Sequence, residues 1–266
     1  MSEITFNSAA AERYEQAMAH VTGHFIPCLL RAGRIATGQR VLDIATGTGL
    51  AAQTALTVVG SAGHVTAADA SASMVEQARL RLGNAANVQV CIADGQAMHF
   101  PDATFDAVLC SLGLVFFPDP GLGLAEFHRV LRPGGYAAVS VLTVPQRSYS
   151  GRINVVAARH KPDLQNAIGR TFGLGDETRL RGMFAAAGFH DIETMLERHD
   201  FVLPSFSKYY EPFEAGGASA GEVLRRLPEA SRRAVREEVR QSLKDNGGPV
   251  TIPVELLIAS GIKLLG

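Results

Sequence analysis

Between residues 40 and 142, short apolar segments alternate with segments of helical periodicity. Five segments have the length and apolar content of buried strands: 40–45, 64–69, 88–94, 105–112 and 136–142. Strands that alternate with helices pair in parallel, because each helix carries the chain back to the edge where the next strand begins. This alternation therefore predicts an α/β fold built on a doubly wound, mostly parallel sheet.

The segments between these strands carry helix start and stop signals. Ser71 can cap a helix, and a second helix can begin at Asp119 with Pro120 in its first turn. We expect Pro133-Gly134-Gly135 to stop that second helix. The first helix should bury one face, which comprises Met74, Val75, Ala78 and Leu82.

The flanking sequence extends this pattern. Residues 8–33 are predicted to form two helices with an apolar face, and residues 189–196 and 251–261 are predicted to be the last two strands. The interruption between those strands predicts a helical insertion. We therefore interpret residues 1–266 as a single domain, divided into an N-terminal helical lid (1–35), a cofactor-binding core (36–145) and a substrate-side helical insertion (204–248).

Composition narrows the classes of function. The formal net charge is −1, which argues against a nucleic-acid partner, and 47% hydrophobic residues suffice for a large core. The three cysteines, Cys28, Cys91 and Cys110, lack a CxxC motif and are interpreted as small buried hydrophobes rather than zinc ligands. The first residues lack signal-peptide features, and no long apolar run suggests membrane insertion. We expect a cytoplasmic protein, with homo-oligomer formation left open.

Three acidic residues stand at the ends of successive predicted strands. They are Asp43, Asp69 and Asp94. Because the carboxyl ends of parallel strands form the ligand crevice of an open sheet, we expect all three carboxylates to face one cleft.

The chain around these acids has the features of an adenosine site. Gly47 and Gly49 permit a tight turn into a helix and allow a ligand to approach backbone N–H groups. Asp69 follows Gly49 by 20 residues, where a carboxylate can accept both ribose hydroxyls. Asp94 can accept a hydrogen bond from an exocyclic amine, with Met74 and Ala93 as apolar walls for a purine.

The residues also bear on which adenosine cofactor is bound. A dinucleotide loop has three glycines, whereas here Gly47 and Gly49 are followed by Ala52. Asp43 would repel a pyrophosphate but attract an α-ammonium group. The pattern therefore favours a cofactor that carries an amino acid.

Four ordered segments resemble the class I S-adenosylmethionine-dependent methyltransferases, and among them the UbiE-like small-molecule enzymes. The segments are VLDIATGTG, AADASASMVEQAR, IADGQAMHFPDATFDAVLCSLGLVFFPDP and HRVLRPGGYAAVSVL. The resemblance is specific over residues 36–145 and weaker in the insertion. It implies a seven-stranded sheet whose last strand is antiparallel, and S-adenosylmethionine as the cofactor.

The resemblance also implies roles for individual residues. Asp43 and the following turn would hold the methionine part, Asp69 the ribose and Asp94 the adenine amine, while Ser111 would lie beneath the sulfonium. Ala45 and Thr46 depart from the Gly and Cys of many relatives, and Thr46 puts the detailed loop contacts in question. The cofactor-binding set is Tyr14, Asp43, Ala45, Thr46, Gly47, Gly49, Asp69, Ala70, Met74, Ala93, Asp94, Gly95 and Ser111.

The expected activity is transfer of a methyl group from S-adenosylmethionine to a small, partly hydrophobic metabolite. The stretch SLGLVFF lacks an amine-methylating NPPY signature and favours oxygen or carbon as the acceptor atom. No catalytic residue or metal ligand is predicted, because a sulfonium mainly requires alignment and exclusion of water. Two alternatives remain open at this point: an NAD-dependent oxidoreductase on a similar sheet, and a non-catalytic cofactor binder. Tyr209, Tyr210 and Phe213 either line the acceptor pocket or simply pack.

Overall fold

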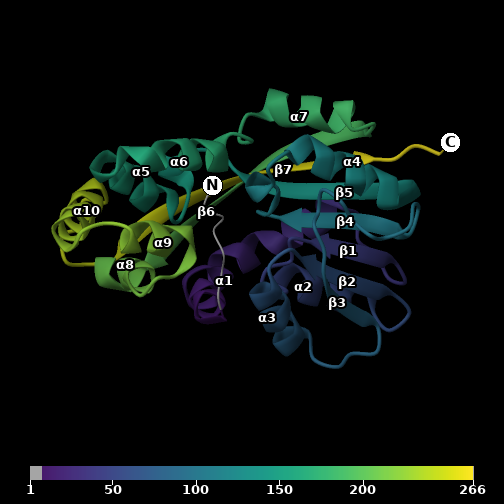
Figure 1. Ribbon diagram of the computed structural model, residues 1–266, viewed down its shortest axis with the longest axis horizontal. Coiled ribbons are helices and arrows are strands. Elements are labelled where there is room, and N and C mark those ends of the chain that lie inside the picture. Colours follow the sequence, from purple (N-terminus) through teal and green to yellow (C-terminus); the bar gives the residue numbers. More distant parts are fainter. Residues whose placement is uncertain (1–7, 266) are drawn as a thin grey trace.

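The computed structural model describes residues 8–265, which form a seven-stranded sheet in the order β3-β2-β1-β4-β5-β7-β6 (Figure 1). The strands are β1 (Arg40–Ile44), β2 (His64–Asp69), β3 (Val88–Ile92), β4 (Phe105–Ser111), β5 (Leu131–Leu142), β6 (His190–Leu203) and β7 (Val250–Ile262). Strands β1 to β5 pair in parallel, and β7 is antiparallel to both β5 and β6. This arrangement confirms the predicted α/β fold class and the antiparallel last strand.

Helices cover both faces of the sheet and extend beyond one end of it (Figure 1). They are α1 (Ser8–Ala32), α2 (Leu50–Val59), α3 (Ala72–Leu82), α4 (Pro120–Val130), α5 (Gly151–His160), α6 (Gln165–Phe172), α7 (Glu177–Ala186), α8 (Phe206–Glu214), α9 (Ala218–Arg225) and α10 (Glu229–Ser242). Short 3-10 turns form η1 (Leu114–Phe116), η2 (Pro145–Arg147) and η3 (Pro162–Leu164). None of the helices within residues 8–265 combines the length and apolarity needed to span a bilayer.

Alternation along the strands explains why two layers of helices are needed. On β1, Leu42 and Ile44 pack into a core with α4 and α7, whereas Val41 packs into a core with α1, α2 and α3. Successive strand residues point to opposite faces, so a strand with both sets buried must lie between two layers. A third core joins the first half of α1 to α5, α8, α9 and α10.

The start of the chain differs from the prediction. Residues 8–32 form one helix, α1, rather than two, and Pro27 lies inside it. The helix continues because Phe25, Ile26 and Leu29 on either side of Pro27 bury a common face, while Pro27 itself is exposed. Burial of that face outweighs the local preference of proline to end a helix.

The boundary between α4 and β5 is a second correction. Asp119 caps α4 as predicted, since its side chain accepts hydrogen bonds from the N–H groups of Gly121 and Leu122. The helix, however, ends at Val130, and the Pro133–Gly135 segment lies inside β5. Leu131 already pairs with Phe105 and is fully buried, so strand pairing begins before the proline and the register shifts around the Gly134 turn.

Two smaller differences concern side chains. The predicted apolar face of α3 is buried, but Ser71 makes no capping hydrogen bond to the helix. Cys110 is buried as expected, whereas Cys28 and Cys91 are only partly buried.

Helices α5 and α6 lie in a region for which the sequence pattern predicted no element.

Arg129 on α4 joins that helix to the chain that follows β3. Its guanidinium donates to the backbone oxygens of Met98 and Phe100 at 2.9 and 2.8 Å, and it pairs with Glu126 and Asp102. Arg129→Met is expected to destabilise the fold by about 2–4 kcal/mol, because it leaves carbonyl groups and a carboxylate without their donor. Urea denaturation measures this free energy.

A matched control uses an exposed ion pair. Arg233→Met removes the pair with Glu229, in which the side chains are 74% and 70% exposed. We expect a change below about 0.5 kcal/mol there. Equal losses in the two variants would contradict the structural role assigned to Arg129.

Candidate functional site

The loop between β1 and α2 has an unusual backbone. Ala45, Gly47 and Gly49 all have positive φ angles, of 55°, 56° and 83°. Within the described chain, no atom lies within 4 Å of the position that a Cβ at Gly47 would occupy. The loop thus leaves open space beside its own backbone, directly before the N-terminus of α2, where N–H groups favour an anionic group.

Asp43 lies beneath this loop and is completely buried. The Thr46 hydroxyl donates to Asp43 Oδ2 at 2.5 Å, whereas Oδ1 has no hydrogen-bond partner among the described residues. Burial raises the pKa of Asp43 to about 7, with the Thr46 hydrogen bond opposing the shift. A buried carboxylate oxygen without a donor is unfavourable, so the geometry fits a ligand that brings a cation or a strong donor.

Asp69, the last residue of β2, ties two loops together. Its Oδ2 accepts the N–H of Gly47 and its Oδ1 accepts the N–H of Ser71, both at 2.9 Å. Burial raises the pKa of Asp69, and these two backbone hydrogen bonds act against the shift. A carboxylate oxygen can accept more than one hydrogen bond, and each Asp69 oxygen is described with one. Asp69 therefore retains acceptor capacity for two hydroxyl groups.

Three predicted site residues, Ala93, Asp94 and Gly95, follow β3 at the same end of the sheet. They make fewer hydrogen bonds to the loops after β1 and β2 than Asp69 does. The Ala93 N–H donates to the Asp69 backbone oxygen at 3.1 Å, and the side chain of Ala93 is buried. Asp94 is exposed, and its Oδ1 accepts the Gln96 N–H at 2.9 Å. Gly95 faces the Phe117 ring, which would lie 2.3 Å from an added Cβ. Met74 is buried on α3, whereas Ala70 is exposed after β2.

The chain after β4 packs directly against the loop after β1. Ser111 ends β4, and Leu112 follows it with a φ of 58°. A Cβ added at Gly113 would lie 2.4 Å from the Ala45 Cβ and 3.0 Å from Cys110 Sγ. Leu112 precedes Gly113 in the chain and Ala45 packs against Gly113, and both Leu112 and Ala45 have positive φ angles. Backbone strain of this kind gathers at functional sites.

Helix α1 brings Tyr14 to the same region. Burial raises the pKa of the Tyr14 phenol, and the nearby carboxylates of Glu15 and Asp69 raise it further, against the effect of the Thr22 hydroxyl. The phenol therefore lies close enough to Asp69 to be affected by its charge. Helix α1 therefore brings the Tyr14 phenol near the carboxylate that joins the loops after β1 and β2.

Sequence reasoning did not identify three residues that hold α1 over the glycine loop. Glu15 accepts a hydrogen bond from the Thr48 hydroxyl at 2.6 Å and forms an ion pair with Arg81 of α3. Arg81 Nε also donates to the Thr48 backbone oxygen at 2.7 Å. We call Glu15, Thr48 and Arg81 the loop clamp. No local pattern could reveal it, because Glu15 is separated from Thr48 by 33 residues and from Arg81 by 66.

An apolar cluster lies beyond these loops. Tyr14, Leu112 and Leu142 pack against a core that includes Tyr149 and Ile153. The aromatics whose role was left open are fully buried: Tyr209, Tyr210 and Phe213. Their burial favours packing over exposure to an acceptor. Three histidines lie around α1 and β6: His20 contacts the Tyr149 hydroxyl at 3.2 Å, and the ring centroids of His24 and His199 are 3.7 Å apart.

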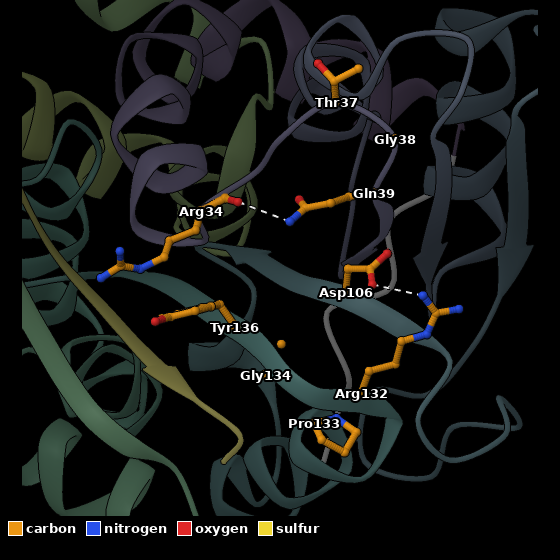
Figure 2. A pocket seen from close by; sticks show the side chains of 10 residues that line it. Arg34, Thr37, Gly38, Gln39, Asp106, Arg132, Pro133, Gly134 and Tyr136 are labelled. Carbon is orange, nitrogen blue, oxygen red and sulfur yellow. Dashed lines mark hydrogen bonds and ion pairs between the residues drawn. The ribbon is translucent and has the colours of Figure 1, made fainter. Parts of the chain in front are cut away.

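A polar depression lies at the other end of the strands, where β1, β4 and β5 begin, and is separate from the glycine loop (Figure 2). Its charged side chains have partners within the protein: Asp106 accepts hydrogen bonds from the Arg40 N–H at 2.7 Å and from Arg132 at 2.9 Å. Arg34 lies over the Tyr136 ring, 4.7 Å from its centroid. None of the predicted cofactor residues lines it. Because ligands of open α/β sheets bind at the carboxyl ends of strands, we place the candidate site at the glycine loop.

In the part of the chain that the structure describes, no group of three or more His, Cys, Asp or Glu side chains is arranged to hold a metal ion.

The chain is similar to known methyltransferases. A methyltransferase domain family matches residues 41–135. The ubiquinone/menaquinone biosynthesis C-methyltransferase UbiE of Cellvibrio japonicus is 34% identical over 179 residues, covering 62% of this chain and 72% of that protein. The demethylmenaquinone methyltransferase of Staphylococcus epidermidis (strain ATCC 35984) is 33% identical over 167 residues, covering 58% and 69%.

Solved structures share the fold at lower identity. The YcgJ protein of Bacillus subtilis has a TM-score of 0.60 at 19% identity, covering 91% of this chain and 99% of that chain. Phosphoethanolamine N-methyltransferase 2 of Haemonchus contortus, solved with S-adenosyl-L-methionine, has a TM-score of 0.60 at 18% identity, covering 97% and 58%. The solved structures show the shared fold. The methyltransferase domain and the UbiE relatives show that the chain belongs to the class I S-adenosylmethionine-dependent methyltransferases and is UbiE-like.

Proposed function

We propose that this methyltransferase acts on a small hydroxylated aromatic of the quinol type and methylates a carbon or an oxygen atom. The observation that carries the acceptor class is the similarity to enzymes named for ubiquinone, menaquinone and demethylmenaquinone methylation. The apolar cluster around Leu112, Leu142 and Tyr149 supports it, because an aromatic acceptor needs an apolar surface beside the end of β4.

We also propose how the chain holds the cofactor. The unpartnered Oδ1 of Asp43 accepts from the α-ammonium group, and the backbone from Thr46 to Gly49 receives the carboxylate. Asp69 accepts from the ribose hydroxyls and Asp94 from the adenine amine, between Met74 and Ala93. Ala70 and Gly95 border the nucleoside, Ser111 lies below the sulfonium, and Tyr14 covers it.

In this proposal the chain aligns the acceptor with the methyl group and excludes water, and no side chain is assigned as a general base. The cofactor supplies an electrophilic methyl group bound to positively charged sulfur. The loop clamp keeps the first half of α1 over the glycine loop, which excludes water from the cofactor side. Residues 1–35 would act as the lid and 204–248 as the substrate-side insertion of a single domain, although residues 1–7 of that lid lie outside the described residues.

Asp69→Ala tests the assignment of the nucleoside site. We expect S-adenosylhomocysteine to bind ten- to a hundredfold more weakly, a loss of about 1.5–3 kcal/mol, because the ribose hydroxyls lose a charged acceptor. Titration calorimetry measures the affinity. Asp163→Ala, at a carboxylate paired with Lys161 away from the glycine loop, serves as the control. Unchanged affinity in Asp69→Ala would contradict the assignment.

The acceptor class requires its own measurement. The enzyme and S-adenosylmethionine are incubated with 1,4-dihydroxynaphthalene, with other quinols and with simple phenols. Mass spectrometry detects methylated products. A product carrying the methyl group on carbon or oxygen supports the proposal. Absence of product from every hydroxylated aromatic, together with methylation of an amine, would overturn it.

A further inference from the structure

We propose that Asn154 recognises a hydroxyl group of the acceptor, with Ser219 orienting its side chain; this rests on the proposed function. Asn154 lies on α5 and is only 5% exposed. Its Nδ2 donates to Ser219 Oγ at 3.4 Å, while its Oδ1 is buried and has no hydrogen-bond partner within the described residues. The amide is thus held on one side and unsatisfied on the other.

Helix α5 carries Asn154 and is linked through two other helices to the segment after β4 and to α1. Helix α5 packs against both α6 and α9; α6 contacts η1, which follows β4, and α9 contacts α1. Neighbouring α5 residues, including Ile153, belong to the same apolar cluster as Tyr14 and Leu112. Helix α5, which carries Asn154, therefore packs within the group of helices that also holds the apolar cluster around Tyr14 and Leu112.

The environment also indicates the chemistry of the ligand. A buried amide oxygen requires a donor, and its unfavourable burial is relieved by a hydrogen bond from a bound molecule. The surrounding cluster is apolar and aromatic, and among the described residues no acidic side chain hydrogen-bonds to Asn154. A neutral hydroxyl on an aromatic ring satisfies both conditions, whereas a cationic amine would lack a counter-charge.

The backbone that carries Ser219 is firmly placed. Ala218 has a φ of 53°, and a Cβ added at Gly221 would lie 2.3 Å from the backbone of Gly216. The first turn of α9 therefore packs tightly on the segment before it. Ser219 is held at a defined distance from α5, as a residue that orients the Asn154 amide must be.

The test compares two naphthalene probes with enzyme saturated by S-adenosylhomocysteine. We expect the wild-type protein to bind 1,4-dihydroxynaphthalene at least tenfold more tightly than 1,4-dimethoxynaphthalene, which cannot donate a hydrogen bond. Asn154→Leu should abolish this preference without weakening the binding of S-adenosylhomocysteine. Its melting temperature should stay the same or rise, because the variant no longer buries an unpaired amide oxygen.

Two further variants keep the result interpretable. Val155→Ala alters the same helix at a side chain outside the apolar cluster and should retain the preference for the dihydroxy probe. Ser219→Ala removes the 3.4 Å hydrogen bond and should weaken dihydroxynaphthalene about threefold or more. It serves as the test if Asn154→Leu fails to fold.

The outcomes separate this inference from the proposed function. If the wild-type protein prefers the dihydroxy probe and Asn154→Leu keeps that preference, the role of Asn154 is wrong while the quinol-type acceptor stands. If the wild-type protein binds S-adenosylhomocysteine but neither naphthalene, the quinol-type acceptor is wrong and the inference falls with it. If the wild-type protein binds both naphthalenes equally, the role of Asn154 is likewise wrong. A preference that Asn154→Leu abolishes and Ser219→Ala reduces, while the control variant keeps it, supports both.

Discussion

Replacing Asp43 with Asn is expected to weaken binding of S-adenosylhomocysteine about a hundredfold while making the cofactor-free protein more stable at pH 8. Affinity falls because the α-ammonium group loses a buried charged partner, a loss on the order of 3 kcal/mol. Stability rises because Asp43 is fully buried with an unpartnered oxygen, and the uncharged amide removes that penalty. Calorimetry and urea denaturation measure the two effects.

The pH dependence follows from the same group. The pKa of Asp43 rises from 3.8 to about 7 on folding, so the folded protein holds this proton more tightly than the unfolded chain. The stability from this proton is fully present below about pH 4 and is lost as the pH rises to about 7, a change of about 4 kcal/mol. Asp43→Asn should lack this slope, so the difference between variant and wild type should grow from pH 4 to pH 7.

Cofactor affinity should depend on pH in the opposite sense. Below about pH 7 the Asp43 carboxyl is protonated in the free protein and must lose its proton to pair with an α-ammonium group. Wild-type affinity should therefore fall as the pH is lowered, and the affinity of Asp43→Asn should not show this dependence. Parallel pH profiles for the two proteins would show that Asp43 does not contact the ammonium.

Gly113→Ala is expected to disrupt the site through the backbone alone. The added Cβ would lie 2.4 Å from the Ala45 Cβ and 3.0 Å from Cys110 Sγ, so the loop after β1 must move. We expect a destabilisation of about 1–3 kcal/mol from overpacking. Because Ala45 belongs to the loop that we propose receives the amino-acid part of the cofactor, affinity for S-adenosylhomocysteine should fall at least tenfold.

The matched control is a glycine with open space around it. Gly182 lies on the exposed side of α7, and no atom is found within 4 Å of its Cβ position in the described chain. Gly182→Ala should stabilise the protein by up to about 1 kcal/mol, because alanine favours a helix over glycine. If Gly113→Ala proved equally harmless, the contact between the loops after β1 and β4 would not control the site.

The positions of the strands along the chain and the placement of the acidic residues could be predicted because both depend on short-range patterns. Strand β2 has the predicted bounds, and the helix after Ser71 buries the predicted face. Asp43 lies in β1 and Asp69 ends β2, where the apolar pattern itself ends. Local periodicity over a few residues determines these features, so one sequence is enough to locate them.

Other features required the tertiary structure, because they depend on residues far apart in the chain. The sequence by itself determined the fold class and the loops that meet at one sheet edge. The packing of separate elements determined that α1 passes Pro27 without a break, that Glu15 meets Thr48 and that Asn154 is left with an unpaired oxygen. Each of these results from burying surfaces against partners that no local pattern specifies.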